Sequence, residues 1–295
     1  MLHSPDDLLA DLTRRYQEAF PTQLLGLYLV GSYAVGEATP ASDLDVVVVF
    51  NAPLDAAGQA CFAAVRATCQ QTSPLLLDCS ATSLDALQRV GGVWFQTASR
   101  LIAGDDIRPL VPQKPAAAHA RDLMYAVIPL IARMRGSPAT LRIPLTFPDP
   151  VGPIDGYDQR TVQIGAWRQP VGTKDLVSTV LAIANALTWQ TARRYVGSGR
   201  KRDIPEQYAL VIGDGWTSLV EAVFFRCRGD WGYQIPAAVA ELAELQGICR
   251  RALGFENHFL AIYRGFLEAE QRDSDPQVAA RAAQRAAMFV DAQER

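Results

Sequence analysis

The chain has 295 residues, a net charge of −3 and a hydrophobic fraction of 49%. This length fits two modest domains. The acidic balance lacks the basic footprint of a non-specific nucleic-acid binder. The N-terminus lacks the basic start and apolar core of a signal peptide, and no apolar run approaches the roughly 20 residues of a membrane-spanning helix. Five cysteines without CxxC spacing indicate free thiols. We therefore expect a cytoplasmic protein with no nucleic-acid or membrane partner.

The first third of the chain predicts a small α/β domain. We expect a helix over 5–20, strands over Leu24–Val30 and Asp43–Phe50, a second helix over 54–70 and a third strand over Leu75–Cys79. The second of these strands contains consecutive valines, which are typical of a central strand buried on both faces.

From about residue 117 the sequence changes to Ala- and Leu-rich helical patterns. Helices are expected over 117–135, 174–196, 205–228, 236–253, 255–271 and 276–293. The Pro- and Gly-rich stretch 136–173 is expected to be a long loop. The predicted architecture is therefore an α/β (α+β) head with a small mixed sheet over 1–115, followed by an all-α bundle over 116–295.

A short constellation of polar residues carries the chemistry. Gly31-Ser32 ends the first strand, where the backbone can approach a ligand closely, and ten intervening residues lead to Asp43-Leu44-Asp45. Asp43 and Asp45 are two residues apart on a strand, so both side chains face the same side. Two such carboxylates beside a triphosphate would repel it unless cations intervened. The motif therefore predicts two Mg²⁺ ions, with Mn²⁺ as an alternative.

Asp78 ends the third predicted strand, PLLLD. If that strand pairs beside the valine-rich strand, the Asp78 carboxylate joins the same face. It would then serve either as a metal ligand or as the base that takes the acceptor hydroxyl's proton. The sequence leaves both roles open.

The segment GSYAVGEATPASDLDVVVV resembles the signature of the polymerase-β-like nucleotidyltransferases. The plan of the whole chain resembles the aminoglycoside adenylyltransferases of the streptomycin/spectinomycin type. That resemblance implies transfer of AMP from ATP, as co-substrate, to a hydroxyl of a small-molecule drug. It implies that Ser32 and Ser42 contact the nucleotide and that Asp43 and Asp45 bind metal. Asp78 stands where the family carries a glutamate read as the catalytic base.

The resemblance continues more loosely into the second domain. In TWQTARRYVGSGRKRDIPEQYA, Lys201 or Arg202 takes the place of a lysine that meets the ATP phosphates, although a solvated basic turn explains the same residues. The stretch GAWRQPVGTKD, with Trp167 and Asp175, matches one that meets the amines of the drug. It offers few carboxylates for a polycation, which Asp214, Glu221 and Asp230 could supplement.

Three functions compete on these grounds. The first is an adenylyltransferase acting on an aminoglycoside-type antibiotic. The second keeps the reaction but takes a protein hydroxyl as acceptor, as in toxin–antitoxin nucleotidyltransferases. The third is a non-catalytic nucleotide-binding interaction module, which the three acidic residues disfavour. A tRNA acceptor is disfavoured by the net negative charge.

Overall fold

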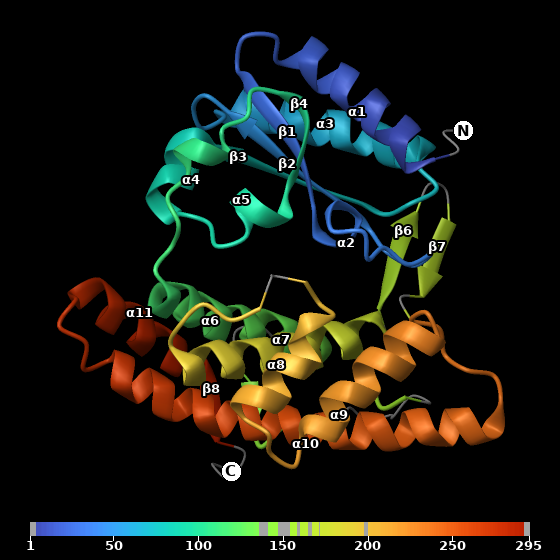
Figure 1. The fold of residues 1–295 in the computed structure, drawn as a ribbon, viewed down its shortest axis with the longest axis vertical. Coiled ribbons are helices and arrows are strands. Elements are labelled where there is room, and N and C mark those ends of the chain that lie inside the picture. Colours follow the sequence, from blue (N-terminus) through green and yellow to red (C-terminus); the bar gives the residue numbers. More distant parts are fainter. Residues whose placement is uncertain are drawn as a thin grey trace. The chain divides into compact units, whose positions relative to one another are not determined.

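The computed structural model describes residues 4–135, 141–146, 154–157, 160–164, 167–170, 172–197 and 200–291 (Figure 1). The chain divides into two compact units. The first, which we call the head unit, comprises Met1–Ala116, Thr161–Gln169 and Gly197–Arg200. The second, the helical unit, comprises Ala117–Arg160, Pro170–Val196 and Lys201–Arg295. Within the described ranges, no helix combines the length and apolarity needed to cross a membrane.

The head unit is built on a four-stranded sheet with helices against both faces (Figure 1). Its elements in chain order are α1 (Pro5–Ala19), β1 (Leu24–Val30), α2 (Gly31–Ala34), β2 (Leu44–Phe50), α3 (Ala56–Thr72), β3 (Leu77–Ser83), α4 (Leu84–Val90), α5 (Phe95–Ala98), β4 (Arg100–Gly104) and a 3-10 helix (Arg108–Leu110). A separate two-stranded sheet is formed by β6 (Thr161–Ile164) and β7 (Trp167–Pro170).

The strand order of the main sheet is β3-β2-β1-β4. β2 pairs in parallel with β3 and antiparallel with β1, which in turn pairs antiparallel with β4. The mixed sheet and the internal position of the valine-rich strand are therefore confirmed. β4 was not predicted, because its five residues, RLIAG, show no alternation and little β-branching.

One face of the sheet carries the main hydrophobic core. Leu44, Val46 and Val48 of β2 point to this face together with Leu77 and Cys79 of β3. They meet buried side chains at helical spacing, namely Leu8, Leu12 and Tyr16 of α1 with Phe62 and Cys69 of α3. The apolar stripe of each of these helices is thus buried against the apolar face of the strands.

A smaller cluster covers the opposite face. Tyr28 and Val49 pack there with Ile107 and Val111. The Tyr28 hydroxyl donates to the carbonyl of Asp105 and accepts from the N–H of Ile107, both at 2.8 Å. These bonds hold the chain that leaves β4 against the sheet.

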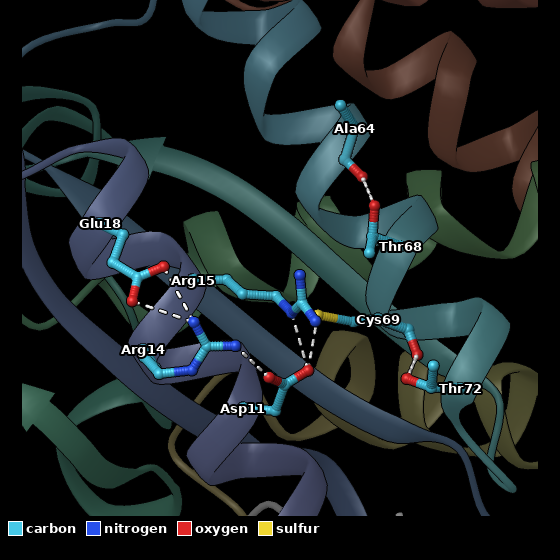
Figure 2. A network of polar contacts seen from close by, with 8 residues as sticks. All are labelled: Asp11, Arg14, Arg15, Glu18, Ala64, Thr68, Cys69 and Thr72. Atoms are coloured by element: carbon cyan, nitrogen blue, oxygen red, sulfur yellow. Dashed lines mark hydrogen bonds and ion pairs between the residues drawn. The ribbon is translucent and has the colours of Figure 1, made fainter. Parts of the chain in front are cut away.

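A polar network lines α1 where it meets α3 (Figure 2). The Asp11 carboxylate accepts from Arg14 at 2.7 Å and from Arg15 at 2.8 Å, and the Cys69 thiol of α3 lies 3.9 Å from it. Burial by itself would raise the pKa of the Asp11 carboxyl, but the hydrogen bonds from Arg15 and Arg14 outweigh it and lower the pKa. The charged form of Asp11 is therefore the one that supports this helix pair, and its contribution is lost as the pH falls through that lowered pKa.

The helical unit contains the remaining elements. They are α6 (Ala116–Arg135), β5 (Leu141–Ile143), α7 (Lys174–Ala192), α8 (Asp203–Val211), α9 (Thr217–Ala222), a π-helix (Val223–Asp230), α10 (Val239–Glu270), α11 (Pro276–Ala286) and β8 (Phe289–Asp291). β5 pairs in parallel with β8. The predicted loop over 136–173 contains the short strands β5, β6 and β7, and parts of it lie outside the described residues.

Several helix boundaries differ from the sequence prediction. The helices expected over 174–196 and 276–293 end at Ala192 and Ala286, and β8 lies where the second was expected to continue. Two further differences involve glycine. The helix expected over 205–228 is broken at Gly213, whose φ of 60° ends α8. The break expected after residue 253 is absent, because α10 runs on through Gly254. A Cβ at Gly254 would lie 3.0 Å from the Trp216 ring, so this glycine makes room for a packed tryptophan rather than ending the helix.

A buried ion pair joins α6 to α10 inside the helical unit. The side chains of Arg135 and Glu256 are 1% and 0% exposed, and the guanidinium Nε lies 2.9 Å from the carboxylate. The Tyr157 hydroxyl donates to the same carboxylate at 2.8 Å, and Arg135 also donates to the carbonyl of Asp155 at 3.2 Å. Arg135 and Glu256 depend on each other, because a buried charge without its partner is strongly destabilising.

Glu256→Ala should lower the free energy of unfolding by about 3–5 kcal/mol, since it leaves the Arg135 charge buried and uncompensated. Urea denaturation of the variant and the wild type measures this. Glu268→Ala, at an exposed position of the same helix, is the control and should stay within about 0.5 kcal/mol of the wild type. A loss below 1 kcal/mol for Glu256→Ala would contradict the assigned role.

Candidate active site

Two aspartates lie side by side on neighbouring parallel strands. The register of β2 and β3 pairs Asp45 directly with Asp78. Their neighbours Leu44 and Leu77 point into the main core, so both carboxylates point to the opposite face of the sheet. Asp45 is partly exposed and Asp78 is exposed. The structure thus brings two of the three predicted acidic residues together.

The predicted position of Asp78 on its strand is wrong, although its face is as expected. Asp78 is the second residue of β3 and not its last, because β3 continues to Ser83 in register with Phe50. The polar residues that follow Cys79 give no strand signal of their own. Their backbone pairing with β2 is what extends the strand.

Gly31 follows the end of β1, on the same side of the sheet's strand ends as Asp45. Val30, the last residue of β1, is the register partner of Asp45. Gly31 has a φ of 66°, and a Cβ built on it would lie 2.1 Å from Oδ2 of Asp45. The left-handed backbone and the close carboxylate both require glycine here. The absent side chain leaves the Asp45 carboxylate room beside the turn.

Asp43 precedes β2 and lies near Tyr33 on α2. Burial, and then the charge of Asp43, raise the pKa of the Tyr33 hydroxyl. Tyr33 was not among the predicted site residues, although it follows Gly31-Ser32 in the same motif. Ser32 lies between Gly31 and Tyr33 on α2 and is partly exposed. The turn after β1 therefore faces the segment that carries Asp43.

Ser42 lies in the tight turn before Asp43 and is 6% exposed. Its hydroxyl oxygen accepts from the backbone N–H of Thr39 at 2.9 Å and lies 3.2 Å from the Thr39 hydroxyl. The backbone N–H of Ser42 donates back to the carbonyl of Thr39 at 2.9 Å. The side chain of Ser42 thus closes the turn that delivers Asp43 to the start of β2.

The donor set suits a hard divalent cation. Asp43 and Asp45 offer only oxygen ligands, and Oδ2 of Asp45 lies close beside the Gly31 backbone. Among the residues that the structure describes, no group of three or more His, Cys, Asp or Glu is arranged to hold a metal ion.

Lys201 and Arg202 belong to the helical unit and are exposed at the start of α8. Arg202 lies 3.9 Å from the Asp203 carboxylate. The helix dipole disfavours positive side chains at the N-terminus of a helix. The alternative interpretation of Lys201 and Arg202, as a basic turn stabilised at a helix C-terminus, therefore does not apply. Their contact with phosphate stays a prediction. Both residues lie beside the N-terminus of α8.

The residues expected to meet the acceptor are largely engaged. Asp175 is 5% exposed and holds Arg160 by two hydrogen bonds of 2.8 Å, while Arg133 lies 3.8 Å away. Asp214 accepts from the Tyr208 hydroxyl at 3.0 Å. Asp230 forms an ion pair with Arg226 at 2.6 Å, and Glu221 is exposed on α9. The side chain of Trp167 lies outside the described residues.

Comparison with known proteins gives a family for part of the chain. Residues 10–76 match the family model of the nucleotidyltransferase domain. That span begins in α1 and ends just before β3, so it includes Gly31, Asp43 and Asp45 but not Asp78. No curated protein sequence matches the chain.

The fold has a counterpart among solved structures. Spectinomycin adenyltransferase AAD(9) from Enterococcus faecialis, solved with ATP and spectinomycin, superposes with a TM-score of 0.52. The alignment covers 85% of this chain and all of that one, at 13% sequence identity. The likeness therefore extends beyond the head unit into the helical unit and concerns the fold.

Gly31→Ala should lower nucleotidyl-transfer turnover by about a hundredfold, or ~2.7 kcal/mol of barrier, because the added methyl displaces the Asp45 carboxylate. Gly36→Ala is the matched control. Gly36 also has a positive φ, of 72°, but no atom lies within 4 Å of the Cβ position. Both variants carry backbone strain of about 1 kcal/mol, so only the contact with Asp45 distinguishes them. Equal turnover for the two variants would show that this contact has no catalytic consequence.

Proposed function

We propose that this chain, a nucleotidyltransferase whose fold resembles that of the aminoglycoside adenylyltransferases, transfers AMP from ATP to a hydroxyl of a small molecule, an aminoglycoside-type antibiotic. The observation that carries the proposal is the registered pair Asp45 and Asp78 beside Gly31, with Asp43 immediately before β2. This arrangement supplies carboxylates for metal and for the proton of the acceptor beside a turn whose backbone has no side chain at Gly31.

Asp43 and Asp45 are the residues proposed to hold Mg²⁺. When bound, the metal ions neutralise charge on the phosphates and polarise the α-phosphate. Asp45 lies on the face of β2 opposite the core, so the packing of its neighbours Leu44 and Val46 fixes its direction. Asp43 directly precedes the strand. The Gly31–Ser32 turn is proposed to approach the triphosphate, with Ser42 supporting it through the turn before Asp43.

Asp78 is proposed as the base for the acceptor hydroxyl. The hydroxyl oxygen attacks the α-phosphorus of ATP, the bond from that phosphorus to the bridging oxygen of pyrophosphate breaks, and the hydroxyl proton passes to the Asp78 carboxylate. Adjacent strands lie about 4.8 Å apart, which places Asp78 within one strand of Asp45. Its exposure leaves it accessible to an acceptor.

Lys201 and Arg202 are proposed to bind the phosphates of ATP. Both side chains are exposed and cationic, and the N-terminus of α8 beside them adds backbone N–H groups that attract anions. Charge-assisted contacts of this kind would favour the departing pyrophosphate.

The acceptor is proposed to carry few positive charges. Asp175, Asp214 and Asp230 already have partners inside the helical unit, so they do not offer free carboxylates to a polycation. An antibiotic with one or two amines fits this surface better than a drug with many. The same observation supports a second candidate acceptor, a hydroxyl on a protein.

Asp45→Asn should lower turnover by at least roughly a thousandfold, which corresponds to about 4 kcal/mol of barrier. The amide cannot hold a divalent cation as a carboxylate does, yet it keeps the shape of the side chain. Asp85→Asn, an exposed aspartate on α4 paired only at the surface with Arg89, is the control and should retain full turnover. Pyrophosphate release is the readout, and an Asp45→Asn variant within tenfold of wild type would contradict the metal role.

A panel of acceptors separates the two candidates. Spectinomycin and aminoglycosides of increasing amine number should be tested with ATP and Mg²⁺, with intact mass showing an added AMP. Turnover is expected on the members with the fewest amines and should fall as the number rises. Activity that increases with amine number would refute the charge argument. No activity across the panel, together with AMP on a co-expressed protein, would transfer the proposal to the protein acceptor.

A further inference from the structure

The tyrosines of the head unit differ in how they use their hydroxyl groups. The unit contains Tyr16, Tyr28 and Tyr33. The Tyr28 hydroxyl bonds to the backbone of the segment that leaves β4, and the Tyr16 hydroxyl donates to the carbonyl of Phe62 at 3.4 Å. The Tyr33 hydroxyl makes no hydrogen bond among the residues that the structure describes. Its oxygen therefore has a different use from the other two.

The ring of Tyr33, by contrast, does contribute to the fold. It is partly buried and packs against the main hydrophobic core, to which Leu44 of β2 also belongs. The short helix α2 that carries it packs on β1 and β2 (Figure 1). A phenylalanine ring would fill the same space. The packing of the head unit thus explains the ring of Tyr33 and leaves its hydroxyl unexplained.

The backbone places Tyr33 close to the start of β2. Val30 at the end of β1 is the register partner of Asp45, and α2 begins directly after Val30. Leu44, the residue after Asp43, is buried in the same cluster as the Tyr33 ring. Burial raises the pKa of the Tyr33 hydroxyl, and the charge of Asp43 raises it further. The hydroxyl therefore lies within reach of the charge on Asp43.

A hydroxyl in this place suits a carboxylate that binds a cation. Tyrosine is neutral at physiological pH and donates one hydrogen bond. Carboxylates that ligate metal ions are in turn hydrogen-bonded, and these bonds orient them. Asp45 lies within β2 between two buried neighbours, whereas Asp43 lies outside the strand. An orienting donor is therefore of more use to Asp43 than to Asp45.

We propose that Tyr33 is a positioning residue of the metal site, whose hydroxyl holds the Asp43 carboxylate in the orientation that binds the divalent cation. This inference rests on the proposed function, because it takes Asp43 to be a ligand of Mg²⁺. Tyr33 touches neither the cation nor the acceptor. It acts through Asp43, so its loss weakens the site without abolishing it.

Direct measurement of cation binding tests the role of the hydroxyl. Tyr33→Phe removes the oxygen and keeps the ring, so its unfolding midpoint in urea should be unchanged. With a non-hydrolysable ATP analogue present, its Mn²⁺ affinity should fall about tenfold, as followed by electron paramagnetic resonance of the free ion. Tyr16→Phe, which loses a hydroxyl that bonds to the backbone of α3, is the matched control and should keep the wild-type affinity. Equal Mn²⁺ affinity for Tyr33→Phe and the wild type would overturn the proposal.

A double-variant cycle tests whether the hydroxyl acts through Asp43. In a protein that already carries Asp43→Asn, Tyr33→Phe should cause no further loss of Mn²⁺ affinity, because the charged ligand that the hydroxyl orients is gone. A further loss of about tenfold in that background would show that Tyr33 acts by another route, and the proposal would be wrong.

Kinetics separate a positioning role from a general structural one. In Tyr33→Phe, the Mg²⁺ concentration that gives half-maximal turnover should rise about tenfold, while turnover at saturating Mg²⁺ stays within about threefold of the wild type. A loss of turnover that excess Mg²⁺ does not restore would contradict a role in orienting a metal ligand.

The same Mn²⁺ measurement distinguishes failure of this inference from failure of the proposed function. If Asp45→Asn binds Mn²⁺ as tightly as the wild type, the metal site itself is wrong and the role of Tyr33 is overturned with it. If Asp45→Asn weakens Mn²⁺ binding and Tyr33→Phe does not, the metal site stands and only the role of Tyr33 is overturned.

Discussion

The parallel pairing of β2 with β3 is the constraint on which the head unit depends. Side chains alternate along a strand, so the register that buries Leu44 and Leu77 against α1 and α3 turns Asp45 and Asp78 to the other face. A slip by one residue on either strand would bury a carboxylate and expose a leucine, which combines two unfavourable transfers. The hydrophobic core therefore aligns the polar site without any direct contact to its oxygens.

The other side of β2 completes the arrangement through the antiparallel strand β1. Val30 opposite Asp45 fixes where the chain must turn, and Gly31 is the residue that can turn there with a carboxylate so close. The turn through Ser42 then returns the chain with Asp43 in place. Backbone geometry and side-chain chemistry thus converge at one edge of the sheet. This convergence suits a reaction in which the protein mainly positions phosphate, metal and acceptor.

The helical unit treats its charges differently. Glu256 and Asp175 are both buried, and each is paired with arginine inside the unit. Buried carboxylates of this kind stabilise only as long as the pair is complete, so they are poor candidates for binding a cationic ligand. Lys201 and Arg202 at the start of α8 are exposed instead, and Arg202 lies 3.9 Å from the Asp203 carboxylate. This distribution of charge supports the proposal that the helical unit meets the phosphates of ATP rather than a polycationic acceptor.

The sequence by itself determined the elements that depend on local pattern. The valine run predicted a central strand, and the Leu and Tyr spacing in α1 predicted its buried stripe. The sequence pattern did not predict which distant segments pair with each other. The extension of β3 past Cys79, the existence of β4 and the continuation of α10 through Gly254 are each decided by a partner remote in the chain. The partners of Asp175 are likewise tertiary, because an ion pair leaves no periodic signal in the sequence. Local pattern reports which side of an element is apolar, whereas only the folded chain decides what that side meets.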